Sequence, residues 1–283
     1  MNSKALFNDL VKSITIDESI DEIEAIAYIV LENSLAITRT DVLAERRIHV
    51  RPSEEKLIKD IVRRLNTNEP IQYVYGESEF YGRKFKVDSS VLIPRPETEE
   101  LVELVKAHFS SISLSPRIVD IGTGSGCIAI TLALEIAGSK IFATDVSGEA
   151  LETAGCNAMT LGANVKYLNS NILDDDIPVE GLNAVVSNPP YIPVSEMHSM
   201  KNNVTRFEPS LALFVSDEDP LIFYKAIANK AFQSLVDGGL IAMEINERFG
   251  SEVAHLVSEA GFKEVRILKD IFGKERIVKG LRP

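Results

Sequence analysis

The stretch from Ile118 to Leu132, I-V-D-I-G-T-G-S-G-C-I-A-I-T-L, joins an apolar run, a glycine-rich turn and a second apolar segment. The first run, Ile118–Ile121, has the length and composition of a buried strand, and a helix is predicted from Cys127. Glycines let the backbone turn tightly beside a ligand, and the N–H groups that open a helix point toward it. The stretch therefore predicts a strand, turn and helix of the kind that binds nucleotides, with a merely tight turn as the alternative.

Strands and helices alternate around this stretch, beyond Pro116. Five apolar runs predict strands: Ile118–Ile121, Ile141–Thr144, Val165–Leu168, Ala184–Ser187 and Leu240–Ile245. Because helical stretches separate most of them, we expect a parallel sheet covered by helices on both faces. Two closing strands, Val265–Leu268 and Arg276–Gly280, are too close together for a crossover helix and should pair antiparallel at the sheet edge.

The first 70 or so residues are predicted to be helical. Apolar residues recur at helical spacing between Ile20 and Leu35, and a second helix is expected to begin near Thr40-Asp41. A third begins at Pro52-Ser53 with a hydroxyl cap and acids behind it. Gly82 then marks the turn of a β-hairpin over Phe80–Val87. We therefore divide the chain into a helical bundle (1–75), a hairpin linker (76–93) and an α/β domain (94–283).

Composition narrows the class of protein. The 45% hydrophobic and 25% charged residues are typical of a soluble globular chain. No apolar run approaches the roughly 18–20 residues of a membrane span, and the N-terminus lacks the features of a secretory signal. Cys127 and Cys156 have no C-x-x-C partner, which indicates reduced thiols in a cytoplasmic protein. The four histidines are scattered, so we expect no metal site. Because no long apolar run is present, we also expect no membrane association.

The net charge of −12 argues against a nucleic acid as the main ligand, because phosphate-binding proteins normally carry a basic surface. The glycine spacing is G-x-G-x-G over Gly122–Gly126, unlike the G-x-G-x-x-G of dinucleotide sites and unlike a P-loop. Asp145 closes the next strand, where a carboxylate can accept both ribose hydroxyls. Its alternative role is a helix N-cap. The loop and the acid together favour an adenosine-type cofactor.

The fourth strand ends abruptly in Asn188-Pro189-Pro190-Tyr191. Two prolines remove two backbone donors and fix two φ angles, so the corner is rigid. An ordinary strand-terminating turn with a core aromatic is the alternative. With the glycine loop and the acid, the corner resembles the class I S-adenosylmethionine-dependent methyltransferases that modify planar nitrogens, in adenine N6, guanine N2 or glutamine N5.

That resemblance implies S-adenosyl-L-methionine as the cofactor and S-adenosyl-L-homocysteine as its product. Asn171 would reach the adenine edge and Ile172 its face, although many relatives carry an acid and an aromatic or Leu at these two positions. The implied cofactor-binding residues are Gly122, Thr123, Gly124, Ser125, Gly126, Asp145, Asn171, Ile172 and Asn188.

Three further segments are similar to the PrmC/HemK family, whose members methylate the glutamine of the Gly-Gly-Gln motif in peptide-chain release factors. They are Glu69–Glu77, Leu92–Glu99 with its P-R-P-E-T-E, and Arg206–Pro209. The similarity covers nearly the whole chain. It implies a Rossmann-like seven-stranded sheet with the last strand antiparallel, and an N-terminal domain (1–75) that grips the release factor. We expect a cytoplasmic monomer without stable nucleic-acid binding.

An amide nitrogen is a poor nucleophile because its lone pair is delocalised, so acceptors at its N–H groups must stabilise the charge that develops. The Asn188 side-chain oxygen and the Pro189 carbonyl form the natural pair of acceptors. Pro190 fixes the carbonyl before it, and Tyr191 supplies a flat face. These four residues are the predicted catalytic group. The alternatives are a nucleic-acid N-methyltransferase with the same corner and an adaptor protein that has lost catalysis.

Overall fold

The computed structural model describes residues 1–110 and 115–283. By its internal contacts the chain forms two compact units, which are described separately below. One comprises Met1–Tyr75 together with Asn202–Phe207, and the other comprises Gly76–Lys201 together with Glu208–Pro283.

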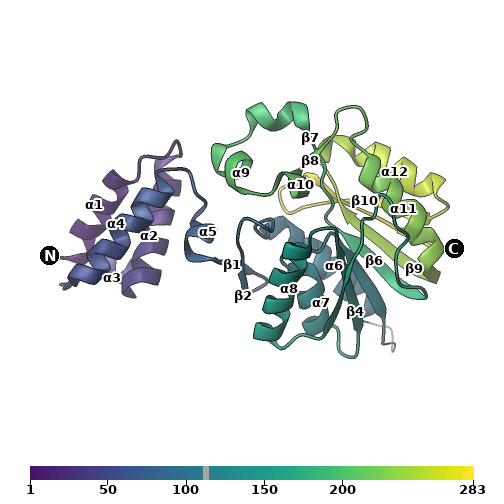
Figure 1. Ribbon diagram of the computed structural model, residues 1–283, viewed down its shortest axis with the longest axis horizontal. Coiled ribbons are helices and arrows are strands. Elements are labelled where there is room, and N and C mark those ends of the chain that lie inside the picture. The colour runs from purple at the N-terminus through teal and green to yellow at the C-terminus, as the bar shows by residue number, and fades with distance from the viewer. Residues whose placement is uncertain (111–114) are drawn as a thin grey trace. The chain divides into compact units, whose positions relative to one another are not determined.

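The first unit is helical, as the apolar spacing predicts (Figure 1). Its core is formed mainly by apolar side chains of the three longer helices, such as Phe7, Leu31 and Leu65. The helices are α1 (Ser3–Ser13), α2 (Ile20–Leu35), α3 (Arg39–Leu43), α4 (Pro52–Leu65) and α5 (Ile71–Tyr75), with α9 (Asn202–Phe207) grouped beside them.

Two predicted helix caps are wrong, although α4 begins at Pro52 as predicted. Thr38, not Thr40 or Asp41, caps α3, because its hydroxyl accepts from the Asp41 N–H while the Asp41 carboxylate accepts from the Thr38 N–H. Arg51 caps α4, so Ser53 lies inside the helix, where Glu54 accepts from the Arg51 N–H at 2.8 Å. Helix α1, capped by Asn2, was not distinguished as a separate element in the sequence.

The second unit is built on a seven-stranded sheet whose order is β10-β11-β9-β6-β3-β4-β5. Five neighbouring strands run parallel, whereas β11 is antiparallel to both β9 and β10. The predicted antiparallel pairing of the two closing strands is confirmed. The last strand, β11, lies between β9 and the edge strand β10. The strands are β3 (Arg117–Ile121), β4 (Lys140–Asp145), β5 (Val165–Asn169), β6 (Leu182–Ser187), β9 (Leu235–Glu244), β10 (Lys263–Lys269) and β11 (Glu275–Leu281).

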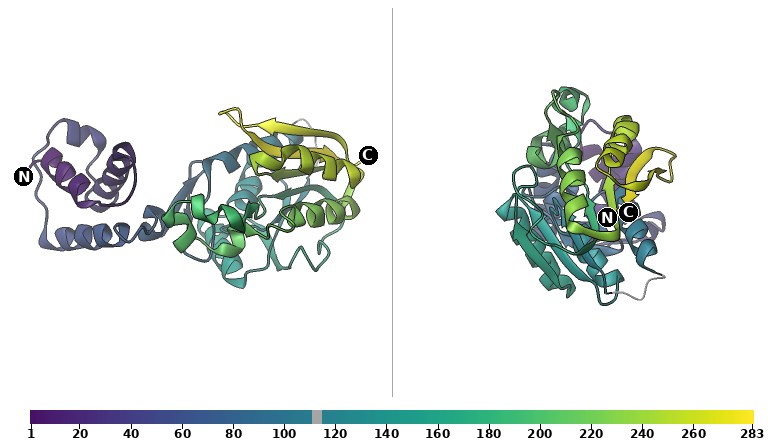
Figure 2. Two further views of the ribbon diagram at one scale, coloured as in Figure 1. Left: turned by 90° about the horizontal axis from the view of Figure 1, so that it is seen from above. Right: turned by 90° about the vertical axis from the view of Figure 1, so that its right-hand side faces the viewer.

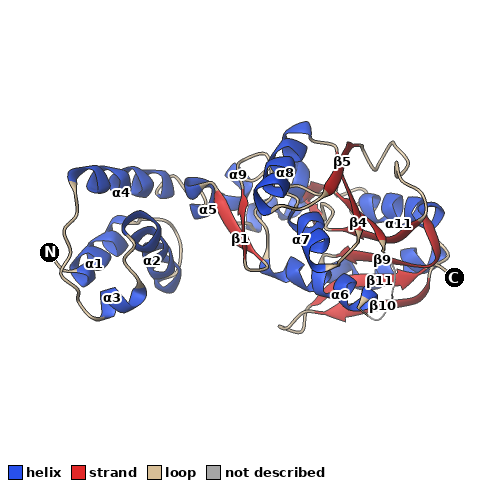
Figure 3. Ribbon diagram, turned by 90° about the horizontal axis from the view of Figure 1, so that it is seen from below, coloured by secondary structure: helices blue, strands red, loops and turns tan. Residues whose placement is uncertain are grey.

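Helices cover both faces of this sheet (Figures 2 and 3). Alternate residues of β3 serve opposite faces: Ile118 packs in one apolar layer and Val119 in the other. The first layer includes α6 (Glu99–Phe109), α7 (Cys127–Glu135) and α8 (Gly148–Leu161), and the second includes α11 (Ile222–Ser234) and α12 (Gly250–Glu259). Burial on both faces explains why these strands are continuously apolar in sequence.

The short elements complete the second unit. The predicted hairpin is confirmed: β1 (Glu77–Phe80) pairs with β2 (Arg83–Lys86), and Tyr81 and Gly82 turn the chain with φ of 53° and 68°. Phe80 and Phe85 from its two strands are buried in the first apolar layer. The others are η1 (Pro96–Thr98), β7 (Ile192–Pro193), η2 (Val194–Ser199), α10 (Ser210–Leu213), β8 (Phe214–Val215) and η3 (Glu247–Phe249).

We predict that Thr131→Val stabilises the protein. Thr131 lies in α7 and is fully buried, and within the part of the chain that the structure describes its hydroxyl has no hydrogen-bond partner. A methyl group in place of an unpaired buried hydroxyl should raise the free energy of unfolding by roughly 1–2 kcal/mol. Urea denaturation measures this value. Thr131→Ser is the control, because it keeps the hydroxyl and loses the methyl. A Val variant less stable than the natural protein would contradict the prediction.

Candidate active site

The predicted site residues meet at the carboxyl edge of the sheet. The loops after β6, β3, β4 and β5 all leave this edge, because these strands are parallel neighbours. They surround a cavity of about 320 Å³. Of the predicted residues, those that line it are Gly122, Gly124, Asp145, Asn171, Ile172, Asn188, Pro189 and Pro190, whereas Thr123, Ser125, Gly126 and Tyr191 do not.

Open space lies above the glycine loop. Gly122 and Gly124 have φ of +72° and +53°, and a Cβ on either would meet no heavy atom within 4 Å. Gly126 differs, because a Cβ there would lie 2.9 Å from Ile130 Cδ1 and 3.1 Å from Ala154 Cβ. The first two glycines therefore leave room for a ligand close to the backbone, whereas packing between helices requires the third.

The side chains between the glycines point into the protein. Thr123 and Ser125 are both buried, and the Thr123 hydroxyl donates to Asp120 Oδ2 at 2.6 Å. The Ser125 carbonyl accepts from Asn157 Nδ2 at 2.9 Å. Asp120 is itself fully buried at the end of β3, and this burial raises its pKa to about 7. The Asp120 and Asn157 side chains therefore support the loop from beneath, through the Thr123 hydroxyl and the Ser125 carbonyl.

Asp145 ties the end of β4 to the glycine loop. Its Oδ2 accepts from the Gly124 N–H and its Oδ1 from the Ser147 N–H, both at 2.9 Å. Burial raises the pKa of Asp145, and these backbone donors oppose that change. Ser147, whose hydroxyl accepts from the Ala150 N–H, is the N-cap of α8. Asp145 therefore lines the cavity and does not cap the helix.

Asn171 is engaged by its own loop. Its Oδ1 accepts from the Leu173 N–H at 3.1 Å, and its Nδ2 donates to Asp174 Oδ2 at 2.6 Å. Ile172 lines the cavity and packs against the second apolar layer, and its carbonyl accepts from Lys230 Nζ. The Asn171 amide thus uses one N–H donor and one lone pair within the turn, so one N–H donor and one lone pair remain for a ligand.

The corner at the end of β6 is held by two residues that the sequence reasoning did not assign to the site. Asn188 Nδ2 donates to Thr98 Oγ1 at 3.2 Å, and Thr98 Oγ1 donates to Glu244 Oε2 at 2.7 Å. The Tyr191 hydroxyl donates to Glu244 Oε1 at 3.2 Å. Glu244 is 2% exposed, so desolvation raises its pKa, and the Thr98 hydroxyl opposes this change. Burial likewise raises the pKa of Tyr191.

In the sequence, only the positions of Thr98 and Glu244 could have indicated that they belong to the site. Thr98 belongs to the P-R-P-E-T-E stretch, and Glu244 is the acid that ends the strand beside β6. Their pairing joins residues 146 positions apart and is a property of the fold.

A second buried acid explains why two distant motifs accompany the corner. Glu208 Oε2 accepts from the Ile93 N–H at 3.1 Å, and its Oε1 pairs with Arg95 at 2.5 Å. Glu208 is 5% exposed. The segments that it joins both reach the cavity, through Leu92 and Pro209. This ion pair therefore holds two walls of the cavity together.

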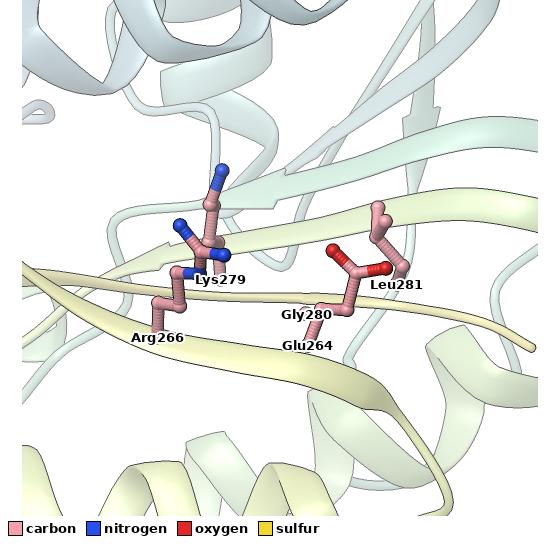
Figure 4. Close-up of a pocket in the computed structure, with 5 residues that line it drawn as sticks. All are labelled: Glu264, Arg266, Lys279, Gly280 and Leu281. Atoms are coloured by element: carbon pink, nitrogen blue, oxygen red, sulfur yellow. The ribbon is translucent and has the colours of Figure 1, made fainter.

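A smaller cavity of about 110 Å³ lies on the β10–β11 pair, away from all predicted site residues. Arg266 and Lys279 face each other there across the strands (Figure 4). Within residues 1–110 and 115–283, no group of three or more His, Cys, Asp or Glu side chains is arranged to hold a metal ion. In the same residues, no helix has the length and apolar character needed to span a membrane.

Comparison with known proteins gives consistent matches along the chain. Residues 97–207 match the methyltransferase small domain, and residues 14–76 match the PrmC N-terminal domain. A release factor glutamine methyltransferase of Bacteroides thetaiotaomicron is 40% identical over 93% of this chain and 94% of its own length. One from Flavobacterium psychrophilum is 39% identical over 91% of each chain.

A solved structure agrees on the fold of the chain. A methyltransferase from Pyrococcus furiosus superposes with a TM-score of 0.52 and 19% sequence identity. The superposition covers 79% of this chain and 98% of that one. At this level of identity the similarity shows the Rossmann-like fold alone.

We predict that Asp120→Asn changes how stability depends on pH. A carboxyl whose pKa is higher in the folded chain takes up protons on folding, so it lowers stability as pH rises from about 4 toward the folded-state value. That value is about 7 for Asp120. The free energy of unfolding of the variant, relative to the natural protein, should therefore increase between about pH 5 and about pH 8. Urea denaturation at both values measures it, and a constant difference would contradict the prediction.

Proposed function

The chain belongs to the release factor glutamine methyltransferase family, and from that premise we propose that it methylates N5 of the glutamine in the Gly-Gly-Gln motif of peptide-chain release factors. The methyl donor is S-adenosyl-L-methionine, and S-adenosyl-L-homocysteine is the product. One observation carries the proposal: the Asn188-Pro189 corner lines the same cavity as Gly122, Gly124 and Asp145. An acceptor pair for an amide thus lies beside a site suited to a nucleoside.

The cavity fits the cofactor. The open space above Gly122 and Gly124 allows the methionyl part to lie against the backbone, and the lone pairs left on Asp145 can accept ribose hydroxyls. Ile172 offers an apolar face to the adenine, while Asn171 has only one donor and one acceptor to spare. When bound, S-adenosyl-L-methionine supplies a methyl group on a positively charged sulfur.

The corner stabilises the amide as it reacts. Asn188 Oδ1 and the Pro189 carbonyl accept the two N–H groups of the glutamine, and their dipoles oppose the positive charge that develops on its nitrogen. The prolines fix the direction of both acceptors, so no reorganisation accompanies the reaction. Tyr191 lies outside the cavity lining and its hydroxyl donates to Glu244, so its proposed role is to support the corner that meets the planar amide. No general base is needed beforehand, since the proton can leave after transfer.

Holding the reactants in line supplies much of the rate. A well-oriented pair gains on the order of 7–11 kcal/mol over free reactants. We propose that residues 1–75 contribute to this orientation by docking the release factor. We further propose that the enzyme acts as a monomer in the cytoplasm, where release factors work, and that it binds no nucleic acid stably, in keeping with the net charge of −12.

We predict that Asn188→Ala nearly abolishes methylation. Loss of one preorganised acceptor should lower kcat by about 10²–10³-fold. Binding of S-adenosyl-L-methionine should weaken only moderately, because the glycine loop and Asp145 remain. Labelled methyl transfer to purified release factors measures kcat, and mass spectrometry locates the modified residue. Calorimetry measures the binding of S-adenosyl-L-methionine.

The matched control is Asn229→Ala, an exposed asparagine on α11, which should behave as the natural protein does. Near-normal turnover of Asn188→Ala would contradict the catalytic assignment. Label on a residue other than the Gly-Gly-Gln glutamine would contradict the proposed substrate. An absence of saturable cofactor binding in the natural protein would favour an adaptor.

We predict that polar substitutions on the N-terminal unit impair methylation of the whole release factor but not of a Gly-Gly-Gln peptide. Leu43 and Leu57 are 71% and 48% exposed there. Their joint replacement by Ser should lower kcat/KM for the protein about tenfold, which corresponds to a loss of about 1.4 kcal/mol shared between the two side chains. Met159→Ser, at a 79% exposed site on α8, is the control. Equal losses on protein and peptide would contradict docking.

A further inference from the structure

The Asn188 carboxamide has two chemically opposite ends. Its Oδ1 accepts hydrogen bonds, whereas its Nδ2 only donates them. The proposed reaction requires Oδ1 to face the glutamine amide, because Nδ2 would repel its N–H groups and the developing positive charge. The two ends have nearly the same size and shape, so packing distinguishes them poorly. A partner with a fixed hydrogen-bond direction is therefore needed to decide which end faces the cavity.

Thr98 is that partner. Its hydroxyl carries a single proton, and this proton is donated to Glu244 Oε2 over 2.7 Å. In that bond the Thr98 hydroxyl is the donor, so its proton is directed toward Glu244 and away from Asn188. The Thr98 oxygen is then left with lone pairs alone to offer Asn188, 3.2 Å away. Only the Nδ2 end of Asn188 can satisfy it.

The geometry directs the other end of the amide toward the cavity. Asn188 lines the cavity, whereas Thr98 is not among the lining residues and is only 2% exposed. Since Nδ2 is turned toward the buried Thr98, Oδ1 lies on the opposite branch of the same planar group.

We propose that Thr98, oriented by Glu244, is a positioning residue that sets the Asn188 carboxamide with its oxygen toward the methyl-accepting nitrogen. The inference deepens the proposed function and rests on it for its catalytic consequence. Thr98 does not touch the substrate. It acts through Asn188, by excluding the orientation in which two donors would face each other.

The two supporting groups are well placed to be rigid. Glu244 ends the interior strand β9, which lies between β11 and β6, and is 2% exposed. Thr98 ends the short helix η1 that leads into α6. The other oxygen of Glu244 accepts from Tyr191, and the Tyr191 carbonyl accepts from Asn246 Nδ2 at 3.4 Å. One buried carboxylate thus holds both side chains of the corner. Because Glu244 accepts from both neighbours, the hydroxyl protons of Thr98 and Tyr191 point toward it and the network has one direction.

The test compares Thr98→Val with Thr98→Ser in the full-length enzyme. Val keeps the shape and removes the hydroxyl, so Asn188 can turn either way, and kcat should fall on the order of 10- to 100-fold. The dissociation constant of S-adenosyl-L-methionine should change less than about threefold, because Thr98 lies outside the cavity. Thr98→Ser keeps the hydroxyl and should therefore retain most of the natural kcat. Thr131→Val is the matched control for replacing a buried threonine, and its kcat should equal that of the natural protein.

A double-mutant cycle distinguishes a purely structural role of Thr98 from a role that acts through Asn188. If Thr98 acts through Asn188, Thr98→Val should add little to the loss caused by Asn188→Ala, as measured in single turnovers. Losses that multiply, or a Thr98→Val variant within about twofold of the natural kcat, would overturn the proposal.

An activity-independent measurement tests the orientation itself. In the natural protein, nuclear Overhauser effects should connect the Asn188 Nδ2 protons to the Thr98 side chain, and in Thr98→Val the Asn188 side-chain signals should broaden or split. Their absence in the natural protein would overturn the proposal. If the natural enzyme shows these contacts yet methylates no release factor, the proposed function fails while the assigned orientation stands.

Discussion

The pairing of β3 with β6 is the constraint on which the rest of the site depends. Ile121 lies opposite Ser187, the Ser187 hydroxyl donates to the Ile121 carbonyl at 2.7 Å, and each strand ends there. The glycine loop and the Asn188 corner therefore begin side by side. A shift of one residue in this register would turn alternate side chains to the wrong face of the sheet. Burial of both faces of these strands fixes the register.

Buried acids organise the edge of the sheet around this pair of strands. Asp120 supports the glycine loop from below, Asp145 joins it to β4, and Glu208 joins two walls of the cavity. Glu244 holds Thr98 and Tyr191. Burying a carboxylate is costly unless it accepts hydrogen bonds, and each of these four acids accepts at least one. Rigidity of the acceptors at Asn188 and Pro189 follows from this framework, and a preorganised site is what amide methylation requires.

Local chemistry made much of the fold and part of the site predictable. Apolar runs located the strands, Gly82 located the hairpin turn, and the spacing of glycines, acid and prolines located the cavity walls. The helix caps predicted at Thr40-Asp41 and Ser53 are wrong, because several residues that can cap a helix stand close together and only backbone geometry selects among them. The insertion of β11 beside β9 depends on long-range pairing that no local pattern encodes.

The sequence by itself determined the alternation of strands and helices, the rigid Asn-Pro-Pro-Tyr corner and the family resemblance, because each depends on residues close together in the chain. Tertiary structure alone decided that Thr98 and Glu244 meet Asn188 and Tyr191. The physical reason is that a hydrogen bond requires two groups within about 3 Å. Sequence spacing does not report that distance when the partners come from different strands and helices.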